Sequence, residues 1–189
     1  MPKKPKLNLR TYEGLKRGLL SLVLYSTFLA VAYEAGTDLL LSGIPLLLAF
    51  LFLMMFGLLN RRSFSNMGQE YSLAVNLFYV LVVGDILNTL FSVTARLGFQ
   101  VEISSILALI GLLLVLSYIF EYSFEILRIS NQFNLKGLKI ASVILLVSTV
   151  LYIILGVIPF SLAVTAAGMF SYAELSKLIN YFKADTRNQ

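Results

Sequence analysis

The chain has 189 residues, of which 58% are hydrophobic and 13% are charged. A soluble domain carries about a quarter charged residues, so this composition indicates an integral membrane protein. Cys, His and Trp are all absent. Their absence excludes disulfides and removes the usual ligands of iron–sulfur, haem, copper and zinc centres. We therefore expect no cofactor and no bound metal.

The net charge of +5 does not indicate a nucleic-acid partner. The basic residues lie beside apolar runs, where they set membrane orientation and meet lipid headgroups. No basic face with interleaved aromatic residues is present, and such a face is typical of nucleic-acid binding. The lipid bilayer is the partner that the charge pattern predicts.

The first half of the chain predicts three spans. Residues 1–17 form a basic N-terminal segment, and an apolar run over 18–33 follows it. Ala30-Val31-Ala32 has the form of a signal-peptide cleavage site, but we interpret this run as a first membrane span. The second span covers 39–59, which is close to the roughly 20 residues needed to cross a bilayer. The third covers 71–94, and Asn66 with Gln69 resembles a capping box before it.

The second half predicts three more spans and leaves one ambiguity. A fourth span covers 103–120, and its helix is expected to continue past the membrane edge through Arg128. The apolar run from Ile140 to Ser176 is too long for one span and just long enough for two, over 140–156 and 160–176. Gly156 and Pro159 supply the residues at which a hairpin turns. Residues 177–189 form a polar tail.

The distribution of charge favours six spans over the alternative of five. With six spans and the N-terminus inside, every lysine and arginine except Arg96 lies on the cytoplasmic side, as the positive-inside rule requires. With five spans, Lys177, Lys183 and Arg187 join Arg96 outside. We therefore predict an all-α, polytopic helical bundle in the cell membrane. Its transmembrane domain covers 18–176, and both termini are cytoplasmic.

Three segments resemble uncharacterised archaeal families of multi-pass membrane proteins. They are Glu13-Gly-Leu-Lys-Arg-Gly-Leu-Leu, Arg61-Arg-Ser-Phe-Ser-Asn, and Ile153-Ile-Leu-Gly-Val-Ile-Pro-Phe-Ser-Leu-Ala-Val. The resemblance implies the same membrane architecture and an archaeal source. Those families have no assigned activity, so the resemblance transfers no functional residue to this chain.

Asp85 is the acid that the sequence places near the middle of the third span. A charge at this depth is costly, and no Lys or Arg lies within a span to balance it. We expect its carboxyl to be neutral or hydrogen-bonded to a neighbour. Asn88, Thr89 and Ser92 follow at helical spacing and form a polar stripe with it. The stripe indicates either an ion, proton or solute site, or hydrogen bonds that hold helices together.

Two further groups of residues are candidates. Glu121 and Glu125 form an acidic pair on one helix face, which fits either a metal or acid–base site or a solvated helix end with a Glu125–Arg128 ion pair. Ala163, Ala167 and Glu174 share a face of the sixth span together with Ala166 and Phe170, and small residues there favour close helix packing. We expect Glu174 to face the bundle near Arg61 or Arg62.

Motifs for nucleotide binding, serine hydrolysis or zinc proteolysis are absent from the sequence. The sequence therefore favours a non-catalytic accessory, assembly or scaffold subunit, which packs against other membrane proteins, further copies of itself or lipid. A small transporter or channel that uses Asp85 is the first alternative. An intramembrane lipid-modifying enzyme that uses Glu121 and Glu125 is the second.

Overall fold

The computed structural model describes residues 9–36 and 38–187, and in them it forms six long helices. These are α1 (Leu9–Glu34), α2 (Leu39–Met67), α3 (Ser72–Arg96), α4 (Val101–Phe133), α5 (Lys136–Leu155) and α6 (Val157–Arg187). A short 3-10 helix, η1 (Gln69–Tyr71), joins α2 to α3. All six long helices are long and apolar enough to cross a membrane. The predicted six-span helical bundle is confirmed, and the five-span alternative is wrong.

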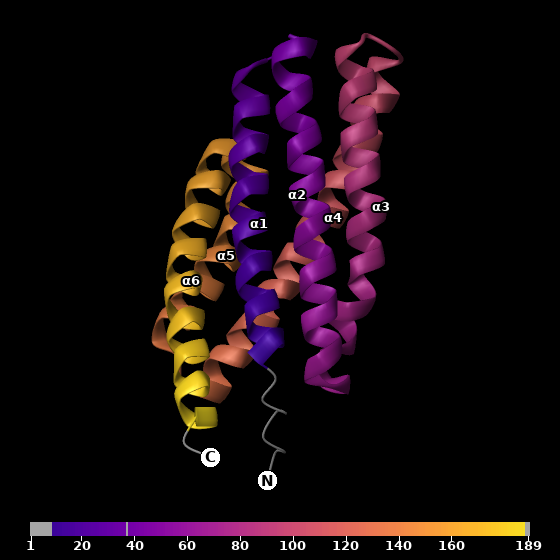
Figure 1. The fold of residues 1–189 in the computed structure, drawn as a ribbon. Helices are drawn as coiled ribbons and strands as arrows, with labels where there is room; N and C mark the ends of the chain where they lie inside the picture. The colour runs from indigo at the N-terminus through magenta and orange to yellow at the C-terminus, as the bar shows by residue number, and fades with distance from the viewer. Residues whose placement is uncertain (1–8, 37, 188–189) are drawn as a thin grey trace.

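The helices run alternately up and down, and each packs against the next in the chain (Figure 1). α6 also packs against α1, so the six helices form a closed ring of neighbours. We call the end where α1 begins and α6 ends the terminal end, and the opposite end the far end. The helices extend beyond the predicted spans at the terminal end. Parts of the predicted polar segments 1–17 and 177–189 are therefore helical.

α4 runs obliquely behind α1 and α2 (Figure 1). In its first half Gly111 lies against Gly84 of α3, where an added Cβ would stand 2.6 Å from the Gly84 carbonyl oxygen. At its last residue, the Phe133 ring lies 5.8 Å from Tyr12 of α1 and 5.9 Å from Phe182 of α6. The oblique path brings one helix into contact with opposite parts of the bundle.

Large aromatic side chains fill the space between α2 and α4. The Phe56 ring of α2 lies 5.7 Å from Tyr118 and 4.8 Å from Tyr122 of α4, and Phe64 lies 5.9 Å from Tyr122. All four rings are almost completely buried. Because these rings separate the two backbones, the interior of the bundle is packed with side chains at this level.

Two details of the predicted connections are wrong. Asn66 does not cap the third helix, because α2 continues to Met67. The residue before η1 is Gly68, with φ 126°, and no side chain caps η1. α2 therefore extends about two turns past residue 59, where the predicted second span ended, and it includes Asn60. Asn60 is completely buried.

The α5–α6 hairpin is shorter than the other two hairpins at the far end (Figure 1). Its turn consists of Gly156 alone, which adopts φ 86° and whose N–H donates to the Tyr152 carbonyl at 3.0 Å. A positive φ at this angle suits glycine, which has no Cβ to clash. Pro159 lies in the first turn of α6, where a missing backbone N–H costs nothing. The longer α3 is tied to the α1–α2 turn by Arg96, which donates to the Gly36 carbonyl at 3.1 Å.

Candidate functional site

Asp85 lies inside the bundle and not toward lipid, with only 1% of its surface exposed. It follows Gly84, so its backbone lies at the closest approach of α3 and α4. The Thr89 hydroxyl donates to Asp85 Oδ1 at 3.4 Å. Asp85 Oδ2 is buried and has no hydrogen-bond partner among the described residues. A buried polar oxygen without a partner costs free energy, which makes this carboxyl a notable feature of the core.

A tyrosine of α1 lies in the vicinity of Asp85. Tyr25 of α1 is buried and lies within electrostatic range of Asp85 and of Tyr152 in α5. Sequence periodicity did not identify Tyr25 or Tyr152, because a tyrosine in an apolar span is equally compatible with lipid contact.

The predicted polar stripe is only partly brought together. Thr89 bonds Asp85, but the donor and acceptor lie on the same helix, one turn apart. Asn88 and Ser92 are half-buried, and the Asn88 backbone lies against Gly111. The nearest polar contact between α3 and α4 lies further along, where the Thr94 hydroxyl donates to Ser104 Oγ at 3.2 Å. Within the described residues, Asp85 therefore makes no hydrogen bond to another helix.

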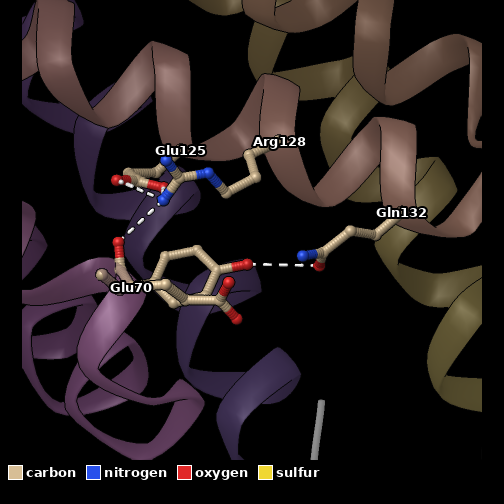
Figure 2. A network of polar contacts seen from close by, with 5 residues as sticks. Glu70, Glu125, Arg128 and Gln132 are labelled. Atoms are coloured by element: carbon tan, nitrogen blue, oxygen red, sulfur yellow. Dashed lines mark hydrogen bonds and ion pairs between the residues drawn. The ribbon is translucent and has the colours of Figure 1, made fainter. Parts of the chain in front are cut away.

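Glu125, the second acid of the predicted pair on α4, lies in a different environment, in the polar network of Figure 2. Glu125 is buried, with 3% of its surface exposed. Arg128 Nη1 lies 3.1 Å from Glu125 Oε2 and donates to the Glu70 carbonyl at 2.7 Å (Figure 2). The predicted Glu125–Arg128 pair is present. The predicted solvated helix end is wrong for Glu125, because η1 covers this face of α4.

The same network fastens the α2–α3 connection to α4. The Tyr71 hydroxyl of η1 donates to Gln132 Oε1 at 3.2 Å, and Arg128 lies over the Tyr71 ring at 5.6 Å. Tyr71 also stacks on Phe64 of α2 at 5.6 Å. Beside the network is a surface hollow lined by Glu121, Glu125, Arg128, Asn131 and Gln132, among others. The arrangement positions α4 against the end of α2.

The described residues contain no group of three or more acidic side chains close enough to hold a metal ion. Glu121 and Glu125 line one hollow, but both oxygens of Glu125 accept hydrogen bonds from Arg128. The carboxylate that would act as a base is therefore occupied by an intramolecular cation.

Glu174 does not meet Arg61 or Arg62, as the sequence analysis expected. Its carboxylate pairs with Lys177 at 2.7 Å, and its side chain lies against Gly137 of α5. Arg61 instead donates to the Tyr79 hydroxyl at 2.7 Å. Of the predicted packing face, Ala167 is buried and Ala163 is half-buried, whereas Phe170 is 48% exposed.

The buried polar groups near the aromatic contact of α2 and α4 were missed from the sequence. Both amide atoms of Asn60 and the hydroxyls of Tyr118 and Tyr122 are buried without a hydrogen-bond partner in the described part of the chain. Asn60 lies one turn from both Phe56 and Phe64, against Gly18 of α1. The available signal was the pair Gly14 and Gly18, a small-x-x-x-small motif that predicts close approach of α1 to another helix.

Comparisons of the chain with family models, curated proteins and solved structures found no significant match. The resemblance to uncharacterised archaeal membrane families therefore stays a prediction. The functional argument rests on the geometry of this chain.

Proposed function

We propose that the chain is a non-catalytic subunit of a larger membrane assembly, in which another membrane protein covers the far end of the α5–α6 hairpin. The observation that carries the proposal is the chemistry of this turn. The other two turns at the far end carry charged residues, namely Glu34, Asp38, Arg96 and Glu102. Residues 152–161 carry none. An apolar turn is unsuited to the aqueous surface.

The length of α5 supports the same conclusion. The apolar part of α5 runs from Ile140 to Leu155 and rises about 24 Å at about 1.5 Å per residue. The hydrocarbon core of a bilayer is about 30 Å thick. With Lys136 and Lys139 at one membrane surface, α5 crosses most of the hydrocarbon core, and the turn at Gly156 lies just inside the opposite edge of that core.

The polar backbone groups at this turn must be shielded from lipid. The last carbonyls of α5 and the first N–H groups of α6 have no partners within their helices. Polar backbone at membrane depth is stable only where protein or water surrounds it. Side chains beside the turn are widely exposed, with Ile154 at 70%, Leu155 at 59% and Leu162 at 69%. A partner helix would bury this surface and shield the turn from lipid.

A second copy of this chain fits the surface less well than a different protein. In a two-fold contact the same patch meets itself, so two short hairpins would face each other. The space beyond both turns would then remain open to lipid. A partner with a longer span covers the turn completely.

Site-specific photo-crosslinking in native membranes tests the proposal. A photoreactive residue replaces Ile154 in one variant and Leu47 in another. Leu47 is a matched control, 57% exposed on α2. We expect Ile154 to crosslink to one protein of defined mass that is not this chain, and Leu47 to give only lipid adducts. Lipid adducts alone at both positions, or crosslinks only to a second copy, would contradict the proposal.

One observation favours a second candidate, a transporter of protons, ions or a small solute. Asp85 Oδ2 is a buried polar oxygen without a partner, and intramembrane acids often mark ion or proton paths. In reconstituted vesicles, Asp85→Asn would abolish a flux that depends on the carboxyl, with no loss of stability. The contacts of Glu125 do not favour the lipid-modifying enzyme, since Arg128 occupies both carboxylate oxygens.

A further inference from the structure

A groove runs between α1 and α2 at the terminal end of the bundle. Three arginines line it, together with one acid and two uncharged polar residues: Arg10, Arg17, Arg62, Glu13, Ser63 and Asn66. The spacing explains the arrangement. Arg10 and Arg17 are two helical turns apart on one face of α1, and Arg62 faces them from α2. Gly14 lies between the two α1 arginines and packs directly on Ser63, so the helices come close at the floor of the groove.

Two of the three arginine side chains in this groove, Arg17 and Arg62, have no partner within the described residues. Both side chains are exposed, and their guanidinium groups make no hydrogen bond or ion pair there. Glu13 is engaged from the other side, where Lys183 of α6 lies 3.4 Å from its carboxylate. The guanidinium groups of Arg17 and Arg62 therefore have no acceptor in the part of the chain that the structure describes.

The neighbouring groove between α1 and α6 provides a contrast. Both of its lysines have partners within the protein. Lys16 lies 4.0 Å above the Tyr172 ring, and Lys183 forms an ion pair with Glu13. Both grooves lie at the same end of the bundle and share Arg17. The two grooves therefore differ in Arg62, which lines only the α1–α2 groove and has no partner within the described residues.

We propose that the α1–α2 groove binds the phosphate of an anionic membrane lipid. A guanidinium presents parallel N–H donors that match two phosphate oxygens, which a lysine cannot do. The groove lies where the apolar runs of α1 and α2 end, at the depth of lipid headgroups. Leu59 lines its apolar side, which suits a molecule that carries acyl chains. Basic pockets between membrane helices are known to take such headgroups.

Lipid binding to the purified full chain tests this proposal, with native mass spectrometry as the measurement. The probes are phosphatidylglycerol, phosphatidylcholine with the same acyl chains, and inorganic phosphate. We expect phosphatidylglycerol to bind at least about tenfold more tightly than phosphatidylcholine, because the headgroup keeps a net negative charge. Equal binding of the two lipids, or binding of inorganic phosphate as tight as that of phosphatidylglycerol, would overturn the proposal.

Two double variants locate the site. Arg17→Gln with Arg62→Gln should weaken phosphatidylglycerol binding about tenfold, since both phosphate donors are lost. Lys136→Gln with Lys139→Gln removes the same charge from the start of α5, and we expect a change below about twofold. Arg17→Lys with Arg62→Lys keeps the charge but not the paired donors, and we expect an intermediate loss. Equal losses in the groove variant and the α5 variant would overturn the proposal, as would no loss in either.

Discussion

Asp85 and Glu125 are both buried acids, but the chain surrounds them differently. Asp85 lies beside a close contact of two helices and accepts one long hydrogen bond from its own helix, while its second oxygen has no partner. Glu125 lies near the end of α4, where Arg128 contacts both of its oxygens and binds the Glu70 carbonyl as well. The comparison indicates that Glu125 fastens the structure, whereas Asp85 leaves hydrogen-bonding capacity unused in the core.

The largest expected difference is in the labelling of the two ends of the bundle from outside the cell, which reports the side of the membrane on which the Glu125 network lies. The charge distribution predicts that both termini, and with them this network, are cytoplasmic. Single cysteines at Lys3, Glu34, Phe99 and Thr186 should react with an impermeant thiol reagent in whole cells only at Glu34 and Phe99. These two positions avoid the glycines of the far turns, whose positive φ disfavours a side chain. Labelling at Lys3 and Thr186 in place of Glu34 and Phe99 would contradict the predicted orientation, and labelling at Thr186 together with Glu34 and Phe99 would contradict six spans.

The Asp85 region should respond most strongly to a change in helix separation. Gly111→Val places a Cβ against the Asn88 amide and the Gly84 carbonyl, so α3 and α4 must move apart. We expect the free energy of unfolding in detergent to fall by about 3 kcal/mol. Gly43→Val is the matched control, because nothing lies within 4 Å of a Cβ at Gly43. Equal losses in the two variants would mean that the contact with Gly84 is not close.

The Glu125 network should respond to loss of its cation. Arg128→Met leaves the buried carboxylate without its ion-pair partner and removes the bond to the α2–α3 connection. Since half of the Arg128 side chain is exposed, we expect a loss of about 2 kcal/mol in unfolding free energy. Lys177→Met breaks the exposed pair with Glu174 and should cost less than about 0.5 kcal/mol. A loss at Arg128 as small as that at Lys177 would mean that the Glu125 pair contributes little.

The smallest effect is expected at Asp85 itself. Asp85→Asn keeps the shape of the side chain and the oxygen that accepts from Thr89. We expect the unfolding free energy to change by less than about 0.6 kcal/mol, a typical value for one hydrogen bond in a membrane interior. Chemical unfolding in mixed micelles is the measurement. A loss above about 2 kcal/mol would show that the charged form is part of the folded state, and the contrast with Glu125 would disappear.

The sequence predicted the order and approximate bounds of the spans from length and hydropathy, and the distribution of charge then predicted six spans in place of five. It did not predict which faces meet. In a membrane the lipid is as apolar as the core, so periodicity does not separate the two faces of a helix. The predicted second span ended at residue 59, yet Asn60 is part of α2 and is buried. The burial of Glu125 depends on η1, a segment distant in sequence whose position a local pattern does not contain.

The one-residue turn at Gly156 has a consequence for how the chain enters the membrane. Residues 140–173 contain no charged side chain. Insertion of α5 and α6 as a joined pair therefore moves no charge across the bilayer, whereas each of the other two hairpins must carry a charged turn to the far side. The energetic barrier that charged side chains impose at the bilayer centre, about 2.5 kcal/mol or more for each, does not apply to this pair. The last two helices can thus enter from one side as a single unit after the first four are in place.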